Sequence, residues 1–177
     1  MPDDTEPEAE AIARAVEAGE DGIALPAELF EEPEGDRPPP QSLYARIFEM
    51  GMAEKIKLAL RGNRDARMIL IRDGSKLVRR FVLQNPRITD GEVIAVARNR
   101  SADEELLRTI SIRREWMRNY QVRLALATNA KTPLPIALKQ VATLAERDLR
   151  QLAKSKNVSQ TIAAQARRLL IAKGEAV

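Results

Sequence analysis

The sequence predicts an all-α fold made of short helices stacked side by side. Aromatic residues, which favour strands, make up 3% of the chain, and the apolar residues, 44% of it, are therefore largely aliphatic. Capping residues recur at short intervals, and the apolar residues between them follow helical spacing, as in Leu77, Val78, Phe81 and Val82. No segment shows the sustained two-residue alternation that is typical of a half-buried strand.

The expected helix starts are marked by residues that favour the N-cap position. Thr89 is followed three positions later by Glu92, the spacing of a reciprocal capping box, and Pro133 is a favoured first-turn residue. The segments between caps run roughly 9–16 residues, the length of ordinary globular helices. The residues that we expect to precede helices are Ser42, Asn63, Ser75, Thr89, Ser101 or Asp103, Thr132 and Ser159.

Charge divides the chain into an acidic and a basic part. Residues 1–40 hold 13 acidic and two basic residues, a net charge of −11, and residues 41–177 hold 27 basic and 13 acidic residues, a net charge of +14. Seven of the ten prolines lie in the acidic part. We therefore expect a mostly disordered acidic tail over residues 1–40 and a basic helical-repeat domain over residues 41–177.

Two segments of the acidic part are less polar than their surroundings. Residues 8–18 favour a weak helix. Residues 23–30 carry Ile23, Leu25, Leu29 and Phe30, which indicate either a nascent helix in a linker or a short docking motif for the basic domain or a partner. An acidic tail that docks on the basic domain would compete with any anionic ligand at high effective concentration.

The chain contains internal repeats. Residues 56–63, 78–85 and 122–129 each begin with a β-branched residue and a base, continue with apolar residues and end in Asn, with offsets of 22 and 44 residues. Residues 97–103 and 153–159 also correspond, with an offset of 56, which implies about 12 inserted residues that we place at 144–151 as one extra short helix. We expect each Asn to end its helix because Asn tolerates the left-handed conformation.

These repeats, with the Asn85-Pro86 turn after an aliphatic helix, resemble the α-solenoid superfamily, in particular HEAT-like repeats and the leucine-rich-repeat variant. The resemblance covers residues 52–173, about two-thirds of the chain. It implies a short right-handed superhelix, or an irregular helical-repeat array, with a binding or scaffolding role. A compact irregular helical bundle is the alternative arrangement.

The composition argues against catalysis. The chain has no His and no Cys, so His-dependent triads and thiolate or imidazole metal sites are excluded. Glycine-rich phosphate loops are also absent, and the carboxylates at 103–105 and at Glu146 and Asp148 suit a first helical turn and surface ion pairs. We expect a protein that is not an enzyme, needs no cofactor or metal, has no membrane span and is cytoplasmic.

Clustered basic residues are the strongest chemical signal, and most of them are Arg, which favours bidentate contacts to phosphate or carboxylate. The expected function is a non-enzymatic interaction module or adaptor that binds an anionic macromolecular partner, an acidic protein surface or nucleic acid, through its basic helical-repeat surface. The alternatives are a nucleic-acid-binding protein that contacts the phosphate backbone, and a solvated basic surface without a ligand. Trp116 and Tyr120, four residues apart, favour core packing, with base stacking or a partner anchor as alternatives. The candidate binding residues are Arg79, Arg80, Arg113, Arg114, Arg118, Lys154 and Lys156.

Overall fold

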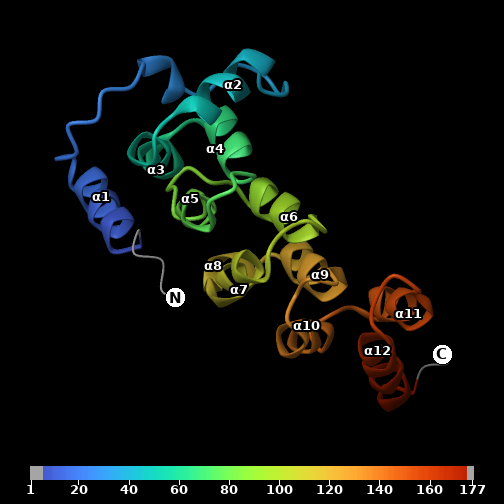
Figure 1. Ribbon diagram of the computed structural model, residues 1–177. Coiled ribbons are helices and arrows are strands. Elements are labelled where there is room, and N and C mark those ends of the chain that lie inside the picture. Colours follow the sequence, from blue (N-terminus) through green and yellow to red (C-terminus); the bar gives the residue numbers. More distant parts are fainter. Residues whose placement is uncertain (1–5, 175–177) are drawn as a thin grey trace. The chain divides into compact units, whose positions relative to one another are not determined.

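A computed structural model describes residues 6–174 and confirms the all-α prediction, because the described chain contains helices and no strand (Figure 1). The chain divides into two compact units, unit 1 (Met1–Ile88) and unit 2 (Thr89–Val177). Within residues 6–174, no helix combines the length and the apolar character that crossing a membrane requires.

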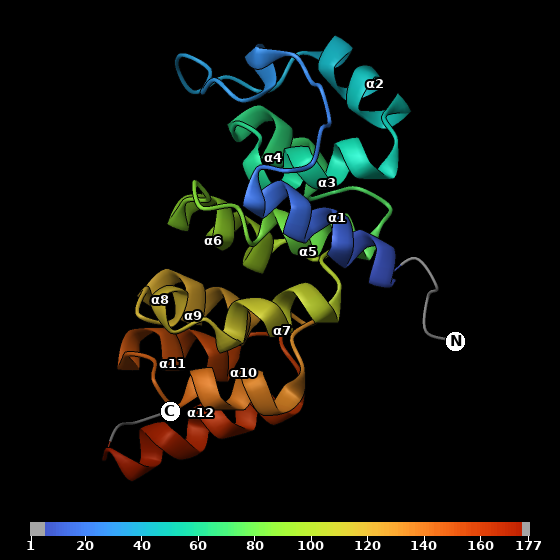
Figure 2. The same ribbon diagram turned by 90° about the vertical axis from the view of Figure 1, so that its left-hand side faces the viewer.

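Unit 1 is built around one central helix. Its elements are α1 (Glu6–Ala18), the 3-10 turn η1 (Ala27–Leu29), α2 (Gln41–Glu49), α3 (Met52–Arg61), α4 (Arg64–Leu70) and α5 (Lys76–Val82). The central helix is α3, which packs against α1, α4 and α5, while α2 packs against α4 (Figures 1 and 2).

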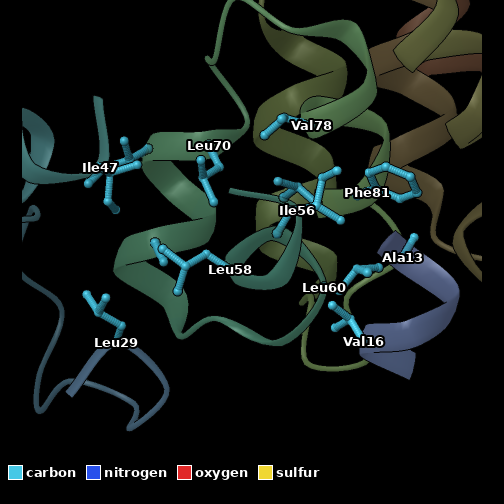
Figure 3. Close-up of a cluster of buried hydrophobic side chains, with 14 of the residues drawn as sticks. Ala13, Val16, Leu29, Ile47, Ile56, Leu58, Leu60, Leu70, Val78 and Phe81 are labelled. Carbon is cyan, nitrogen blue, oxygen red and sulfur yellow. The ribbon is translucent and has the colours of Figure 1, made fainter. Parts of the chain in front are cut away.

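The core of unit 1 joins the acidic N-terminal segment to the basic helices. Ala13 and Val16 of α1 lie close to Leu60 of α3 and Phe81 of α5 in the close-up of this core (Figure 3). Leu29 of η1 is 2% exposed and belongs to the same cluster. Helix α1 is held here because its buried residues recur at three- and four-residue spacing on one face.

This packing corrects the prediction of a mostly disordered tail over residues 1–40. The helix expected at 8–18 is present and spans Glu6–Ala18, and residues 23–30 pack their apolar side chains on the unit's core. Residues 1–5 lie outside the described residues. The boundary between the compact units therefore falls after Ile88 and not after residue 40.

Unit 2 consists of α6 (Asp90–Arg98), α7 (Glu104–Ile112), α8 (Arg114–Met117), α9 (Tyr120–Thr128), α10 (Leu134–Val141), α11 (Glu146–Lys154) and α12 (Gln160–Ala172). Helix α9 packs against α6, α8 and α10, and α12 packs against α10 and α11 (Figures 1 and 2). Aliphatic residues from α9 to α12 form one core cluster, which includes Val141, Leu149, Ile162 and Leu170. The helix that we expected at residues 144–151 corresponds to α11, which begins at Glu146 and continues to Lys154.

Most of the expected caps are present. The side chains of Asn63, Ser75, Thr89, Asp103 and Ser159 each accept a hydrogen bond from a backbone N–H in the first turn of the following helix, and Thr89 with Glu92 forms the predicted capping box. Two starts differ from the prediction. Pro40, and not Ser42, precedes α2, and Pro133, and not Thr132, precedes α10.

Candidate binding site

Two of the repeated asparagines, Asn85 and Asn129, form side-chain hydrogen bonds to the C-terminal end of an earlier helix. Asn85 is 1% exposed, and its side-chain amide donates to the carbonyl oxygens of Ala59 and Gly62 at 2.9 and 3.1 Å. Asn129, 7% exposed, donates in the same way to the carbonyls of Ala97 and Asn99 at 2.7 and 3.0 Å. In both cases the side-chain oxygen accepts the backbone N–H two residues further on. Each Asn therefore ties the C-terminal end of an earlier helix to its own loop.

The third repeated asparagine makes the same kind of contact with the acidic segment. The Asn63 side chain donates to the carbonyls of Glu28 and Glu31 and accepts the backbone N–H of Ala66. The expectation that these residues adopt the left-handed conformation is wrong, because φ is −69° at Asn63 and −81° at Asn129, and among the described residues only glycines have positive φ. Their role is hydrogen bonding in a buried position, where an unpaired carbonyl would be costly.

Two corresponding turns in unit 2 carry cations at matching positions. We call residues 97–100, which carry Arg98 and Arg100, the first basic turn, and residues 153–156, which carry Lys154 and Lys156, the second basic turn. The two turns are separated by the 56-residue offset of the repeat, and each begins with the last two residues of a nine-residue helix, α6 or α11.

Both basic turns are held in place by side chains. Asn129 binds the carbonyls of the first turn, and Arg167 donates to the Ala153 carbonyl of the second at 2.8 Å. The side-chain oxygens of Asn99 and Ser155 each accept the backbone N–H two residues on, at 2.9 and 3.1 Å. The backbone that carries the four cations is therefore fixed by equivalent hydrogen bonds.

A pocket of about 300 Å³ lies between these turns and the facing sides of α9 and α11. Arg98 and Arg100 of the first turn and Ser155 of the second line it, together with Thr128 from α9 and Gln151 from α11. Apolar side chains, which include Leu124, Leu152 and Val158, complete the lining. The pocket therefore combines hydrogen-bond donors and positive charge, which suit an anionic group, with apolar surface.

The charges at this pocket are only partly compensated. Asp148 also lines it, but its carboxylate accepts a hydrogen bond from the hydroxyl of Tyr120, and burial and this contact raise the pKa of Tyr120. Arg98 donates to the side-chain oxygen of Gln121 at 2.7 Å. Arg100 is exposed, and so are Lys154 and Lys156 of the second basic turn, which lie outside the pocket lining. None of these three side chains has a hydrogen-bond or ion-pair partner within residues 6–174.

Unit 1 has an equivalent turn at the end of α3, held by Asn85, and this turn is covered by the acidic segment. Arg61 donates to the carbonyls of Val16 and Glu17 at the end of α1. Gly62 lets the chain lie close to the last turn of α3, since a Cβ at Gly62 would lie 2.3 Å from the Leu58 carbonyl oxygen. Arg64, two residues further on, binds Asp36 at 3.0 Å and the Arg37 carbonyl at 2.8 Å.

The Glu32 carboxylate of the acidic segment contacts three arginines of unit 1. It accepts the backbone N–H of Arg64 at 2.9 Å and pairs with Arg67 at 3.0 Å and Arg87 at 3.3 Å. Burial opposes its ionisation, but the hydrogen bonds from the Arg64 amide and the Arg67 guanidinium outweigh it and hold the pKa of Glu32 below its usual range. Because the Arg67 side chain is only 3% exposed, this pairing satisfies a buried cation.

Further cations of unit 1 are also paired with the acidic segment. Lys57 binds Asp21 and the Ile23 carbonyl, both at 2.6 Å, and the hydrogen bond from Lys57 lowers the pKa of Asp21. Arg80 pairs with Glu6 at 3.1 Å and with Glu10. Because the acidic segment belongs to unit 1, this unit has 13 basic and 17 acidic residues and a net charge of −4. Unit 2 has 16 basic and nine acidic residues and a net charge of +7.

The seven predicted binding residues are divided between the two units. Arg79 and Arg80 lie in unit 1, where Arg79 donates to the carbonyls of Asp73 and Gly74 and Arg80 binds α1. In unit 2, the three arginines at α8 lie outside the pocket lining: Arg113 stacks over Trp116 at 5.0 Å and pairs with Glu115 at 3.5 Å, and Arg114 and Arg118 are exposed. Lys154 and Lys156 lie on the second basic turn.

The structure adds two residues that the prediction left out of the site. Arg98 and Arg100 stand out in the sequence as a basic pair, and both line the pocket, whereas Lys154 and Lys156 do not. The 56-residue offset that aligns the two basic turns is the signal in the sequence that relates Arg98 and Arg100 to Lys154 and Lys156. Trp116, 5% exposed, packs in the interior of unit 2, as the core-packing interpretation expects.

Comparison with known proteins found no matching protein family, no similar curated protein and no similar solved structure.

Proposed function

We propose that the protein is a non-enzymatic interaction module, or adaptor, whose second unit binds an acidic protein partner at the two basic turns. The observation that supports this most directly lies within the chain itself. The Asn85-held turn of unit 1 and the cations beside it bind an acidic polypeptide segment, through Arg61 and Arg64. The Asn129-held turn of unit 2 has the same construction, and none of its cations pairs with a carboxylate among residues 6–174.

The charge distribution also supports this proposal. The acidic segment leaves unit 1 with a net charge of −4, and unit 2 keeps +7. An acidic partner is therefore steered by the field of unit 2, and steering of this kind raises association rates at low ionic strength. Charged contacts at exposed sites contribute modest affinity, so we expect a transient complex that weakens as salt rises.

The proposal includes an α-solenoid-like array and a cytoplasmic location. The asparagine contacts that recur at Asn85 and Asn129 support repeated stacking, because each joins the end of an earlier helix to a later loop. The absence of Cys from the sequence suits a reducing compartment.

Nucleic acid is the second candidate partner, and one observation favours it. Arg100, Lys154 and Lys156 are exposed cations without partners among the described residues, and backbone binding to nucleic acids depends on cations of this kind. The Arg-rich composition of unit 2 suits phosphate as well as carboxylate.

The proposal is tested by titrating the full chain with fluorescent poly-glutamate and, separately, with a DNA duplex and an RNA of random sequence. We expect poly-glutamate to bind more tightly than either nucleic acid at equal salt. We also expect the variant Arg98→Gln/Arg100→Gln to weaken poly-glutamate binding at least tenfold. The matched control is Arg114→Gln/Arg118→Gln, which removes two exposed cations of the same unit outside the pocket lining.

Three outcomes would contradict the proposal. If the chain binds none of the three polyanions, unit 2 has no interaction site of the proposed kind. If it binds DNA or RNA more tightly than poly-glutamate, the partner is a nucleic acid and not a protein. Equal weakening by the two double variants shows a diffuse basic surface instead of a site at the turns.

A further inference from the structure

We propose that the pocket at the two basic turns recognises an apolar side chain that stands next to a carboxylate in the acidic partner. This inference rests on the proposed function and adds the composition of the bound segment to it. The lining of the pocket, the position of Asp148 and the contacts of the chain's own acidic segment each support it.

The lining of the pocket changes in character with burial. We call its exposed members the rim, and they are all polar or cationic: Arg98, Arg100, Thr128, Gln151 and Asn157. We call its buried and half-buried members the floor, and most of them are apolar: Leu124, Ala125, Leu152 and Val158, with Asn129, Asp148 and Ser155. A ligand therefore meets cations and amides at the rim and apolar surface at the floor.

The polar members of the floor already have partners within unit 2. The Asn129 amide donates to two carbonyls of the first basic turn, and the Asp148 carboxylate accepts from the Tyr120 hydroxyl. The Ser155 hydroxyl oxygen accepts the backbone N–H of Asn157. What the floor offers to a ligand is therefore mainly its apolar surface, and an apolar side chain that removes this surface from water is favoured.

Asp148 limits where the carboxylate of the ligand can lie. Asp148 belongs to α11, and a second carboxylate beside it is repelled. A carboxylate beside Arg98 and Arg100 of the first basic turn instead meets two cations, neither of which is paired with a carboxylate among residues 6–174. The carboxylate of the ligand therefore belongs at the first basic turn, which leaves the floor for an apolar group.

The chain's own acidic segment binds unit 1 with the same two components. Leu29 is buried in the core of unit 1, and its carbonyl accepts the backbone N–H of Asn63 at 2.8 Å. Three residues later, Glu32 accepts the backbone N–H of Arg64 and pairs with two further arginines. An apolar side chain and a nearby carboxylate thus bind together in unit 1, and the pocket of unit 2 offers a counterpart for each.

Two synthetic peptides of equal charge test the inference. Each carries three glutamates on either side of a central residue, which is Leu in one peptide and Gln in the other, with a fluorescent label at the N-terminus and an amidated C-terminus. Both are titrated into the full chain at the same salt concentration. We expect the Leu peptide to bind at least tenfold more tightly, a difference of about 1.4 kcal/mol, because the leucine side chain leaves water at the floor.

A matched pair of variants assigns this preference to the pocket. Leu124 and Leu138 are both half-buried and pack on the same core cluster, but only Leu124 lines the pocket. Leu124→Gln should remove the preference for the Leu peptide, and Leu138→Gln should keep it. Val158→Thr, a second change at the floor with a side chain of similar shape, should reduce the preference as well and serves if Leu124→Gln unfolds unit 2.

The outcomes separate this inference from the proposed function. Equal binding of the two peptides to the unchanged protein, or equal loss of the preference in the two leucine variants, would overturn the inference. The proposed function survives either result if Arg98→Gln/Arg100→Gln still weakens both peptides more than Arg114→Gln/Arg118→Gln does. Failure of both peptides to bind the unchanged protein would overturn both.

Discussion

Replacing Asn129 tests the proposal that buried asparagines hold the turns. Its side chain donates to the carbonyls of Ala97 and Asn99 at 2.7 and 3.0 Å and accepts the Lys131 N–H at 2.9 Å. Each hydrogen bond contributes about 1 kcal/mol net, so Asn129→Ala should lower the free energy of unfolding of unit 2 by about 3 kcal/mol. For a unit of 89 residues this lowers Tm by roughly 12–24 °C.

The assay uses a probe that reports on unit 2. Trp116 is the only tryptophan of the chain and is 5% exposed, so its fluorescence follows the unfolding of unit 2 in urea. The matched control is Asn157→Ala, because Asn157 is exposed and its side chain makes no hydrogen bond to any described residue. The control should change the free energy of unfolding by less than about 0.5 kcal/mol.

Asn129→Gly separates the two explanations for this residue. If Asn129 mattered because it tolerates a left-handed backbone, glycine would be accepted or would stabilise the unit. Because φ is −81° and the side chain makes the contacts, we expect glycine to destabilise at least as much as alanine. A glycine variant within about 0.5 kcal/mol of the unchanged protein would refute the hydrogen-bonding explanation.

Three other predictions follow from unit 1 and from Tyr120. The pKa values of Asp21 and Glu32 are lowered from ordinary values of 3.8 and 4.5, so the stability that these carboxylates contribute is complete above those values and is lost as pH falls through the lowered pKa. Acid titration of helicity should show this loss of stability. The variant Asp21→Asn/Glu32→Gln should not show it, which checks the assignment to these two residues. The raised pKa of Tyr120 predicts that its phenol ionises above the ordinary value of 10.0, measured by ultraviolet absorbance in the Tyr44→Phe variant, and ionisation at or below that value contradicts the burial of Tyr120. Deleting residues 1–40 should leave unit 1 susceptible to proteolysis, because Leu29 and the apolar face of α1 leave its core; an unchanged digestion pattern would restore the disordered-tail interpretation.

The helical class and most helix starts were predictable because they depend on local chemistry. Ser75, Thr89 and Ser159 cap the helices that follow them, and this preference is set by side-chain oxygens within one turn. The repeat was also visible, because each copy buries the same positions, such as Ile56, Val78 and Val122, all 0% exposed.

The place of the acidic segment was not predictable from its own composition. Residues 1–40 are acidic and rich in proline, which favours disorder when a segment is considered alone. Their order depends on distant partners, such as Lys57 for Asp21 and Arg67 for Glu32, which a reading of local sequence cannot pair. The same holds for the pocket, which combines turns 56 residues apart.

The central claim is that the acidic segment covers the cations of unit 1 and leaves those of unit 2 open. Acetylation rates of individual lysines, measured by mass spectrometry on the full chain with and without poly-glutamate, test it directly. Lys57, bonded to Asp21 and Ile23, should react slowly in both cases, whereas Lys154 and Lys156 should react quickly and become protected by poly-glutamate. Equal reactivity of Lys57 and Lys154 without poly-glutamate, or unprotected Lys154 and Lys156 at saturating poly-glutamate, would contradict the account.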